Sequence, residues 1–401
     1  MSVRFILGRA GTGKTNMILN EIKEKLRQEP NGSPVIYLVP DQMTFLSEYN
    51  LVNEEGINGM IRAQVYSFTR LAWRILQDTG GLNRYHLSNI GLNMLIRKII
   101  DDKKDQLKLF SRASDKAGFI EHVEVMLTEF KRYCISPEEL SEKQEGWGEG
   151  GQESKALADK LHDLQLIYDS FEENLSGKYI DSEDYFTLLE ESIGKSEFLQ
   201  NAEIYIDGFH SFTPQEYAVI GKLMDNCPRV TIALTAEPDL IPGEQSDLFR
   251  MTSETYEALK ELALASRGDV EDKVVLGKTS RFQNKGLAHI EANFEKRPVM
   301  PFEEEPGMTI LEASNRRAEI EGVAREIRRL ARTESYRYKD MAVLVRNGQE
   351  YQDIIETVFY DYEIPYFIDQ KRKMLNHPLI ELIRSTDRKS TRLNSSHLLI
   401  S

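Results

Sequence analysis

Eight residues near the N-terminus have the types and the spacing of a phosphate-binding loop. They read GRAGTGKT and fit the pattern G-x-x-x-x-G-K-T. In that pattern glycines let consecutive backbone N–H groups turn toward phosphate oxygens, the lysine reaches the β- and γ-phosphates, and the threonine hydroxyl ligates Mg²⁺. The sequence therefore predicts a site for nucleotide phosphates and magnesium, formed by Gly8, Arg9, Ala10, Gly11, Thr12, Gly13, Lys14 and Thr15.

The residues on either side of this loop predict the elements that must position it. The apolar run from Val3 to Leu7 suits a buried strand, and the segment from Asn16 to Leu26 repeats apolar residues at helical spacing. Nucleotide phosphates would then lie at a helix N-terminus, where backbone N–H groups and the helix dipole favour anions. A chance glycine-rich turn is the alternative, and the order strand, loop, helix argues against it.

Further strands extend this unit. Val35 to Val39 (VIYLV) follows a turn-rich segment and is predicted as a second buried strand. Strand, helix and strand joined by short turns form a βαβ unit, which predicts an α/β fold with a largely parallel sheet. Glu203 to Asp207 (EIYID) and Val230 to Leu234 (VTIAL) continue the sheet. The first of these ends in Asp207, where a P-loop fold places its second Mg²⁺ contact, usually through water.

The segment from Val65 to Leu76 (VYSFTRLAWRIL) is predicted as one core-facing helix. Its apolar residues recur at helical spacing, which is typical of a buried stripe. Arg70 and Arg74 would lie off that stripe, where they could contact a phosphodiester.

A long helical region follows, from about residue 85 to residue 193. Its amphipathic segments are centred on residues 90–100, 119–133, 157–171 and 185–192. A polar, glycine-rich break from Ser141 to Glu153 divides it and is predicted as a mobile surface loop. We interpret the region as an all-helical insertion in the α/β domain.

Three carboxylates, Asp181, Glu183 and Asp184, stand close together near the end of this region. They could indicate a metal site. We favour the alternative, in which Asp181 or Ser182 caps the following helix and the other carboxylates favour its first turn.

A second α/β unit is predicted after residue 306. Its strands are Met308 to Glu312, Met341 to Arg346 and Pro365 to Ile368, and its helices are Asn315 to Arg332 and Tyr351 to Tyr360. Four arginines lie mostly off the apolar face of the first helix, at positions 325, 328, 329 and 332. They suggest DNA contact, but interleaved glutamates make a solvated helix face the preferred interpretation.

These patterns divide the chain into segments. The prediction is a P-loop α/β domain over 1–84, a helical insertion over 85–195, the rest of the P-loop domain over 196–305, the start of a second α/β domain over 306–384, and an unrelated tail over 385–401. The tail abandons the preceding pattern and is excluded from fold reasoning.

Composition limits the class of protein. The chain has 401 residues, 40% of them apolar and 29% charged, and no apolar run reaches the roughly 18 residues of a membrane span. Cys134 and Cys227 are far apart and in no metal-ligand spacing, which predicts neither disulfides nor zinc and fits a cytoplasmic protein. The net charge of −14 argues against a generic nucleic-acid binder. An acidic protein can still carry a local row of basic residues that binds nucleic acid.

The order of the motifs resembles a UvrD-like superfamily-one helicase core. The loop is followed by VIYLVPDQMTFLSEY, VYSFTRLAWRIL, IYIDGFHSFTPQE, DMAVLVRN and YEIPYFID. The strand at the very start, IDGF in place of IDEF, and KRKMLNHPLIELIRS together resemble the AddB (RexB) family, whose members are B subunits of bacterial ATP-dependent helicase–nucleases. The resemblance covers about residues 1 to 384.

The resemblance implies a fold of two RecA-like domains, the second only begun. It implies ATP phosphates on the loop, Mg²⁺ near Thr15 and Asp207, and Arg346 near the γ-phosphate, so that Lys14, Asp207 and Arg346 would serve catalysis. It also implies DNA ends and single strands as substrates and an AddA-type subunit as partner in a heterodimer that processes double-strand breaks for recombination. In this family the exonuclease domain and an iron–sulfur cluster lie toward the C-terminus of a much longer subunit, outside this chain.

Two departures from the helicase pattern imply weak hydrolysis. Active helicases follow the strand-end aspartate with a glutamate that orients water, and Gly208 stands there in this chain. Val345 occupies the place of an adenine-stacking tyrosine. One alternative is a nucleotide-gated scaffold that binds DNA and its partner without turnover; another is a P-loop nucleotide kinase, which the large insertion and the second α/β unit disfavour. A Gly208→Glu substitution is expected to distinguish a missing base from a silent scaffold.

Overall fold

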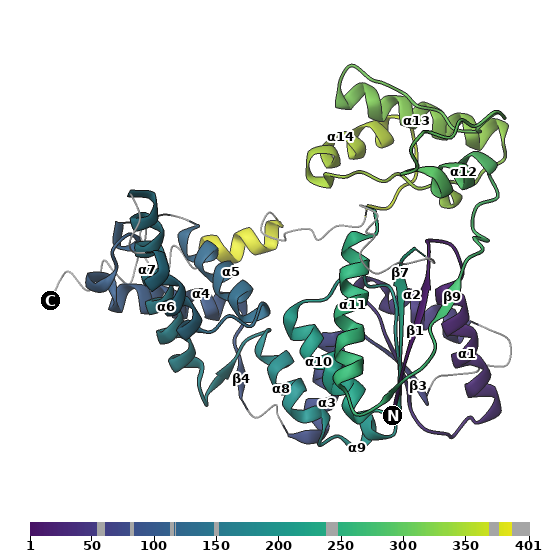
Figure 1. The fold of residues 1–401 in the computed structure, drawn as a ribbon. Coiled ribbons are helices and arrows are strands. Elements are labelled where there is room, and N and C mark those ends of the chain that lie inside the picture. The colour runs from purple at the N-terminus through teal and green to yellow at the C-terminus, as the bar shows by residue number, and fades with distance from the viewer. Residues whose placement is uncertain are drawn as a thin grey trace. The chain divides into compact units, whose positions relative to one another are not determined.

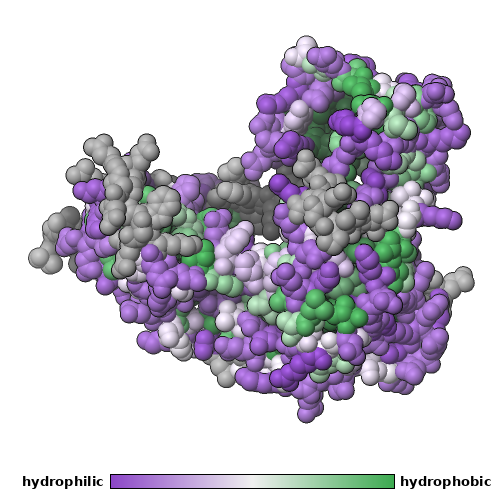
Figure 2. Space-filling model, in the orientation of Figure 1, coloured by the Kyte–Doolittle hydropathy of each residue, from purple (hydrophilic) through white to green (hydrophobic). Residues whose placement is uncertain are grey.

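The computed structural model describes residues 1–53, 61–80, 84–112, 116, 118–147, 152–237, 248–368 and 377–386 (Figure 1). The chain forms two compact units, Met1–Pro306 and Gly307–Ser401. On the face drawn in Figure 2, hydrophilic side chains cover most of the surface and apolar ones gather in smaller patches. None of the helices among these residues combines the length and the apolar composition needed to cross a membrane.

The first unit is built on a parallel sheet. Its strands stand in the order β3-β2-β6-β7-β1-β8, with β9 also paired to β1, and each pairing between them is parallel. Their bounds are β1 Ser2–Gly8, β2 Val35–Leu38, β3 Ala63–Tyr66, β6 Glu203–Ile206, β7 Arg229–Thr235, β8 Asp269–Val270 and β9 Val274–Leu276. The predicted α/β fold with a largely parallel sheet is confirmed.

Helices cover both faces of this sheet (Figure 1). Because side chains alternate along a strand, Val3, Phe5 and Leu7 face one core while Ile6 faces the other. The first core is closed by α3 Phe68–Thr79, α8 Asp184–Ile193, α10 Pro214–Asn226 and α11 Arg250–Ala265. The second is closed by α1 Lys14–Gln28 and α2 Thr44–Val52. Parallel strands covered on both faces explain the nearly continuous apolar runs in the sequence.

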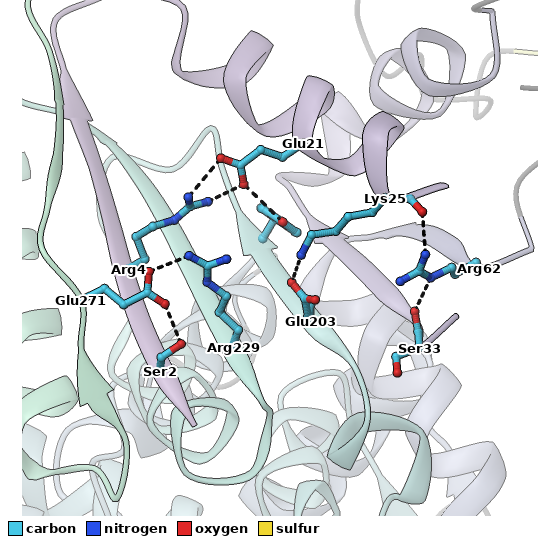
Figure 3. Close-up of polar contacts among 10 residues, drawn as sticks. Ser2, Arg4, Glu21, Lys25, Ser33, Arg62, Glu203, Arg229 and Glu271 are labelled. Carbon is cyan, nitrogen blue, oxygen red and sulfur yellow. Dashed lines mark hydrogen bonds and ion pairs between the residues drawn. The ribbon is translucent and has the colours of Figure 1, made fainter. Parts of the chain in front are cut away.

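Charged side chains fasten α1 to the sheet (Figure 3). Arg4 of β1 donates two hydrogen bonds to the Glu21 carboxylate, at 3.0 and 2.6 Å. Such a bidentate pair fixes orientation as well as distance. Lys25, one turn further along the helix, pairs with Glu203 at the start of β6. These contacts hold the helix in a fixed direction, and so position the loop that joins β1 to α1.

The prediction of one helix from Val65 to Leu76 is wrong for the first residues of that segment. Val65 and Tyr66 belong to β3, which pairs with β2, and α3 begins only at Phe68 after the Ser67 cap. Ser67 accepts a hydrogen bond from the Arg70 N–H, as an N-cap does. The pattern alone missed the strand because four residues are too few to show alternation. The buried stripe itself is confirmed: Phe68, Leu71, Ala72, Ile75 and Leu76.

Most of the predicted helical region forms a separate core, but its last predicted segment, 185–192, forms α8 and packs in the core of the sheet instead, and a short strand pair shows that the region is not all-helical. The helices of this separate core are α4 Asn89–Asp102, α5 Phe119–Arg132, α6 Pro137–Trp147 and α7 Gln152–Leu175, and a two-strand pair, β4 Tyr85–His86 with β5 Tyr179–Ile180, stands at its base. Part of the predicted surface loop is wrong, because residues 141–147 continue α6. Glutamate, lysine and glutamine are good helix formers, so a polar composition did not exclude a helix there. Residues 148–151 lie outside the described residues.

The carboxylates near residue 181 are paired with a lysine side chain and with backbone N–H groups. Lys131, whose side chain is 7% exposed, contacts both Asp181 and Asp184 at 2.7 Å. Asp181 Oδ1 also accepts the N–H of Glu183 and Asp184 at the start of α8. Burial lowers the pKa of Lys131, but the surrounding carboxylates outweigh it and raise the pKa. These contacts support the capping interpretation over a metal site.

The first unit also contains shorter elements. They are α9 Glu197–Gln200 and α12 Lys285–Asn293, together with the 3₁₀ turns Asp41–Met43, Lys104–Gln106 and Phe110–Arg112. The turn from Asp41 to Met43 links β2 to α2 and lies beside the end of β6, where Met43 contacts the Gly208 position.

In the second unit α13 Arg316–Thr333 and α14 Gly348–Asp361 pack on a small apolar core. The three predicted strands are not formed: Met308–Glu312, Met341–Arg346 and Pro365–Ile368 are extended or irregular and make no ladder among the described residues. A strand needs a neighbour to satisfy its N–H and C=O groups, and these segments have none there. Some of their apolar side chains are exposed, such as Ile310 at 99% and Leu344 at 91%, while Met341, Val345 and Ile368 pack against the small apolar core. Most of the predicted tail, 387–401, lies outside the described residues.

Candidate nucleotide-binding site

The predicted loop connects the end of β1 to the start of α1. Asp207 directly follows β6, and β7 stands between β6 and β1 in the sheet. Because all three strands are parallel, their carboxyl ends meet at one edge. In open α/β sheets this edge is where ligands bind.

Glycines give the loop its shape. Gly11 and Gly13 have φ of +82° and +93°, a region that other L-residues rarely adopt. A Cβ at Gly8 would lie 2.6 Å from Thr12 Oγ1 and 2.7 Å from the Leu276 carbonyl oxygen, so a side chain there would force the loop from its neighbours. Successive N–H groups in such a turn form an anion-binding concavity at the start of α1.

Lys14 is buried within the loop, at 8% exposure. Its Nζ donates to the carbonyl oxygens of Gly8 and Arg9, at 2.7 and 3.0 Å. Burial lowers the pKa of Lys14, Asp207 opposes that shift, and Arg281 adds to it. The ammonium group is thus held in the loop, close to where a bound phosphate would sit.

Thr15 and Asp207 meet across this edge. The Thr15 hydroxyl lies 2.7 Å from Asp207 Oδ2, and the Tyr37 hydroxyl donates to the same oxygen at 2.9 Å. The Gly208 N–H donates to Asp207 Oδ1 at 2.9 Å. Mg²⁺ takes one or two protein oxygens and completes its shell with water and phosphate. The Thr15 hydroxyl and the carboxylate of Asp207, a residue 3% exposed, therefore fit a magnesium ion.

Arg9 takes no part in the cradle through its side chain. Its guanidinium group pairs with Glu291 at 2.6 Å and Glu237 at 3.2 Å, and lies over the Phe249 ring. These partners turn it away from Lys14. Arg9 can therefore reach a phosphate only through its backbone N–H.

A cavity of about 530 Å³ opens beside the loop. This is within the usual size of small-molecule sites, about 300–1,000 Å³. Among the described residues that line it, Asp207 is the sole carboxylate. Its walls are Ala10, Gly11, Gly13, Lys14, Thr15, Asn16, Asp207, Gly208, Phe209, His210, Ala233, Thr235, Ser280 and Arg281.

Ser280 and Arg281 were not found by sequence reasoning. The Ser280 N–H donates to the Gly11 carbonyl at 3.1 Å, and Arg281 lies against Gly11 and lines the cavity. Their position follows from β9, which pairs with β1 and carries the next residues across the loop. No motif or periodicity marks this stretch. Only the pairing of the three-residue strand β9 shows that Arg281 is a second positively charged side chain at the site, beside Lys14.

Arg346 and Val345 belong to the second unit. Arg346 is exposed, and Val345 packs against that unit's apolar core. The approach of Arg346 to the γ-phosphate stays a prediction.

Comparison with known proteins shows which family the chain belongs to. Residues 5–291 match the family model described as ADDB, N-terminal. The chain belongs to the AddB family. It is similar to the B subunit of the ATP-dependent helicase/deoxyribonuclease of Geobacillus thermodenitrificans (strain NG80-2), 52% identical over 392 residues, with 96% of this chain and 33% of the relative covered. The corresponding protein of Bacillus mycoides (strain KBAB4) is 50% identical over 389 residues, with the same shares covered.

The chain spans about a third of the length of the curated relatives it matches. Residues 278–385 also match a UvrD-like helicase C-terminal domain. This match begins just before Ser280 and Arg281 and extends across the second unit. It supports the RecA-like assignment of the second unit, although the strands predicted there are not formed.

Proposed function

We propose that this chain is the ATP-binding, DNA-binding N-terminal part of a subunit of a cytoplasmic helicase–exonuclease that processes double-strand breaks for recombinational repair. Its partner would be an AddA-type subunit in a heterodimer. The family membership supports a place in such a complex, since the relatives are named as B subunits of an ATP-dependent helicase/deoxyribonuclease.

One observation carries the ATP-binding part of this proposal. Lys14, Thr15 and Asp207 converge at one edge of the sheet, beside a cavity of suitable size. Mg²⁺ bound there would neutralise phosphate charge. Lys14 would pair with the phosphate oxygens, Thr15 and Asp207 would hold the ion, and Arg281 would add a further positive charge near the loop.

Hydrolysis by this site is proposed to be weak. Gly208 offers no side chain to orient water, and no second carboxylate is found among the described residues that line the cavity. Because a positioned base contributes about 10²- to 10⁴-fold, its absence leaves binding as the main activity. A catalytically silent, nucleotide-gated scaffold is therefore the second candidate function. A nucleotide kinase loses its support, because the chain belongs to the AddB family.

The full-length subunit, co-expressed with its partner subunit, tests the proposal. We expect ATP-dependent degradation of linear duplex DNA, with covalently closed circles left intact because they have no ends. Degradation that proceeds equally without ATP, or attacks circles at the same rate, would contradict it. The isolated full-length subunit is expected to bind ATP but to hydrolyse it at less than about a hundredth of the rate of the complex.

A basic groove on the second unit supports the DNA-binding part. It has a volume of about 540 Å³ and is lined by arginines 325, 328, 329 and 332, which lie about one turn apart on one face of α13, together with Thr333, Asp361, Tyr362 and Glu363. Arg329 pairs with Glu326 and Glu334, and Arg328 donates to the Tyr362 carbonyl at 2.6 Å and pairs with Glu363 at 3.8 Å. Arg325 and Arg332 make no ion pair within the described part of the chain. Two guanidinium groups thus stay available for phosphodiesters on an otherwise acidic chain.

The double substitution Arg325→Glu with Arg332→Glu is expected to weaken DNA binding by the full-length subunit about tenfold near 0.1 M salt. Each lost phosphate contact should also reduce the slope of log K against log salt by about 0.7 to 0.9. Fluorescence anisotropy across a salt series measures both. The matched control, Arg317→Glu with Arg337→Glu, makes the same charge change at arginines already paired with Glu321 and Asp340. An equal loss in both variants would point to net charge alone.

A further inference from the structure

A buried tyrosine contacts the carboxylate of the proposed magnesium site. Tyr37 lies in β2, in register with Tyr205 of β6, and only 1% of its surface is exposed. Its hydroxyl donates to Asp207 Oδ2 at 2.9 Å. Neither the loop motif nor the strand-end aspartate predicts a tyrosine at this place, because the contact crosses from one strand to the next.

The hydrogen bonds to Asp207 are divided unequally. Oδ1 accepts the Gly208 N–H, which belongs to the next residue, while Oδ2 accepts the hydroxyls of Thr15 and Tyr37. Thr15 is itself a proposed metal ligand, so its hydroxyl is shared between two tasks. Tyr37 lies on a rigid, fully buried strand and does not line the cavity. The hydrogen bond from Tyr37 to Oδ2 therefore does not depend on what the loop binds, whereas the one from Thr15 does.

The support continues beyond the tyrosine. The Ser47 side chain of α2, on a residue 5% exposed, hydrogen-bonds the Tyr37 hydroxyl. A buried carboxylate that loses such a donor pays a desolvation penalty, because water cannot replace it.

We propose that Tyr37 is a positioning residue for the magnesium site, whose hydroxyl fixes the Asp207 carboxylate in the orientation that a metal ion at Thr15 and Asp207 requires. The proposal rests on the proposed ATP and Mg²⁺ binding. It assigns Tyr37 a role in metal affinity, distinct from the packing of its ring in the core beneath α1. Such partners behind a metal ligand commonly change affinity tenfold or more when removed.

Tyr37→Phe in the full-length subunit tests it, because only the hydroxyl is lost. Binding of a fluorescent ATP analogue is measured as Mg²⁺ is titrated, with a series in EDTA as reference. We expect the half-saturating Mg²⁺ concentration to rise about fivefold to tenfold, while nucleotide affinity in EDTA changes less than about twofold. Ser47→Ala should shift the Mg²⁺ curve in the same direction by a smaller factor.

Tyr205→Phe is the matched control. Tyr205 is the register partner of Tyr37, equally buried, and its hydroxyl lies 3.4 Å from Glu21, away from the cavity. It should leave the Mg²⁺ curve unchanged. An unchanged curve for Tyr37→Phe, or equal shifts in both variants, would overturn the positioning role and leave nucleotide binding intact. If the parent protein binds no ATP analogue in either series, the proposed function fails and this inference fails with it.

Discussion

Lys14→Ala is expected to lower the affinity of the full-length subunit for ATP by about thirtyfold to a hundredfold. The substitution removes a cation that can bond phosphate oxygens directly, and charge-assisted hydrogen bonds are about twice as strong as neutral ones. A loss of about 2 to 3 kcal/mol corresponds to that range. Lys14 now donates to two carbonyl oxygens of its own loop, so its ammonium group is already placed beside the N–H groups of the cradle.

Isothermal titration calorimetry with a non-hydrolysable ATP analogue measures this change. Lys23→Ala is the matched control, because Lys23 also lies on α1 and is 9% exposed, against 8% for Lys14. The control should bind the analogue as the parent does. Far-ultraviolet circular dichroism should be unchanged in Lys14→Ala, since no helix or strand depends on that side chain. Equal affinity in Lys14→Ala and the parent would refute the nucleotide site.

Local patterns in the sequence were sufficient for the loop and for its supporting elements. The chemistry of GRAGTGKT needs one strand before it and one helix after it, and both are adjacent in the chain. Asp207 could be predicted for a related reason, because parallel strands bring their carboxyl ends to one edge. The structure places Asp207 Oδ2 2.7 Å from the Thr15 hydroxyl, an ordinary hydrogen-bond length between two oxygens.

Residues that reach the site from distant strands could not be predicted in this way. Arg281 depends on the pairing of β9 with β1, and Tyr37 on the register between β2 and β6. Neither pairing leaves a local signal in the sequence, because which strands pair depends on contacts between residues that are far apart in the chain. The opposite error occurred in the second unit, where apolar segments such as 341–346 predict strands but find no neighbour among the described residues. A strand pattern predicts a tendency, and pairing decides whether a sheet forms.

Gly208 shows how the structure changes an experiment suggested by the sequence. Its φ is +85°, and a Cβ built there would lie 2.7 Å from the sulfur of Met43 and 3.2 Å from Pro40 Cδ. The end of the Met43 side chain and the Pro40 ring thus lie where a glutamate side chain would enter, and both would have to shift to admit it. A glutamate at this position would therefore need its neighbours to move before its carboxylate could orient water.

Gly208→Glu is accordingly expected to destabilise the first unit by about 2 to 4 kcal/mol without raising ATP hydrolysis. About 1 to 2 kcal/mol comes from a left-handed backbone at a residue with a Cβ, and the rest from overpacking against Met43 and Pro40. Urea unfolding followed by fluorescence measures the loss, and phosphate release measures hydrolysis. Gly208→Ala should show most of the same loss, because the conflict begins at the Cβ.

Gly80→Ala separates the two causes. Gly80 has nearly the same φ, +88°, but a Cβ there meets nothing within 4 Å. Its substitution should therefore cost only the backbone term, and the additional loss in Gly208→Ala reports packing against the 40–43 turn. Adding Met43→Ala to Gly208→Glu should recover part of the stability, because the sulfur is the nearer obstacle. If Gly208→Glu keeps the parent's stability and accelerates hydrolysis, then the turn does yield to a side chain, and the missing carboxylate alone explains a weak site.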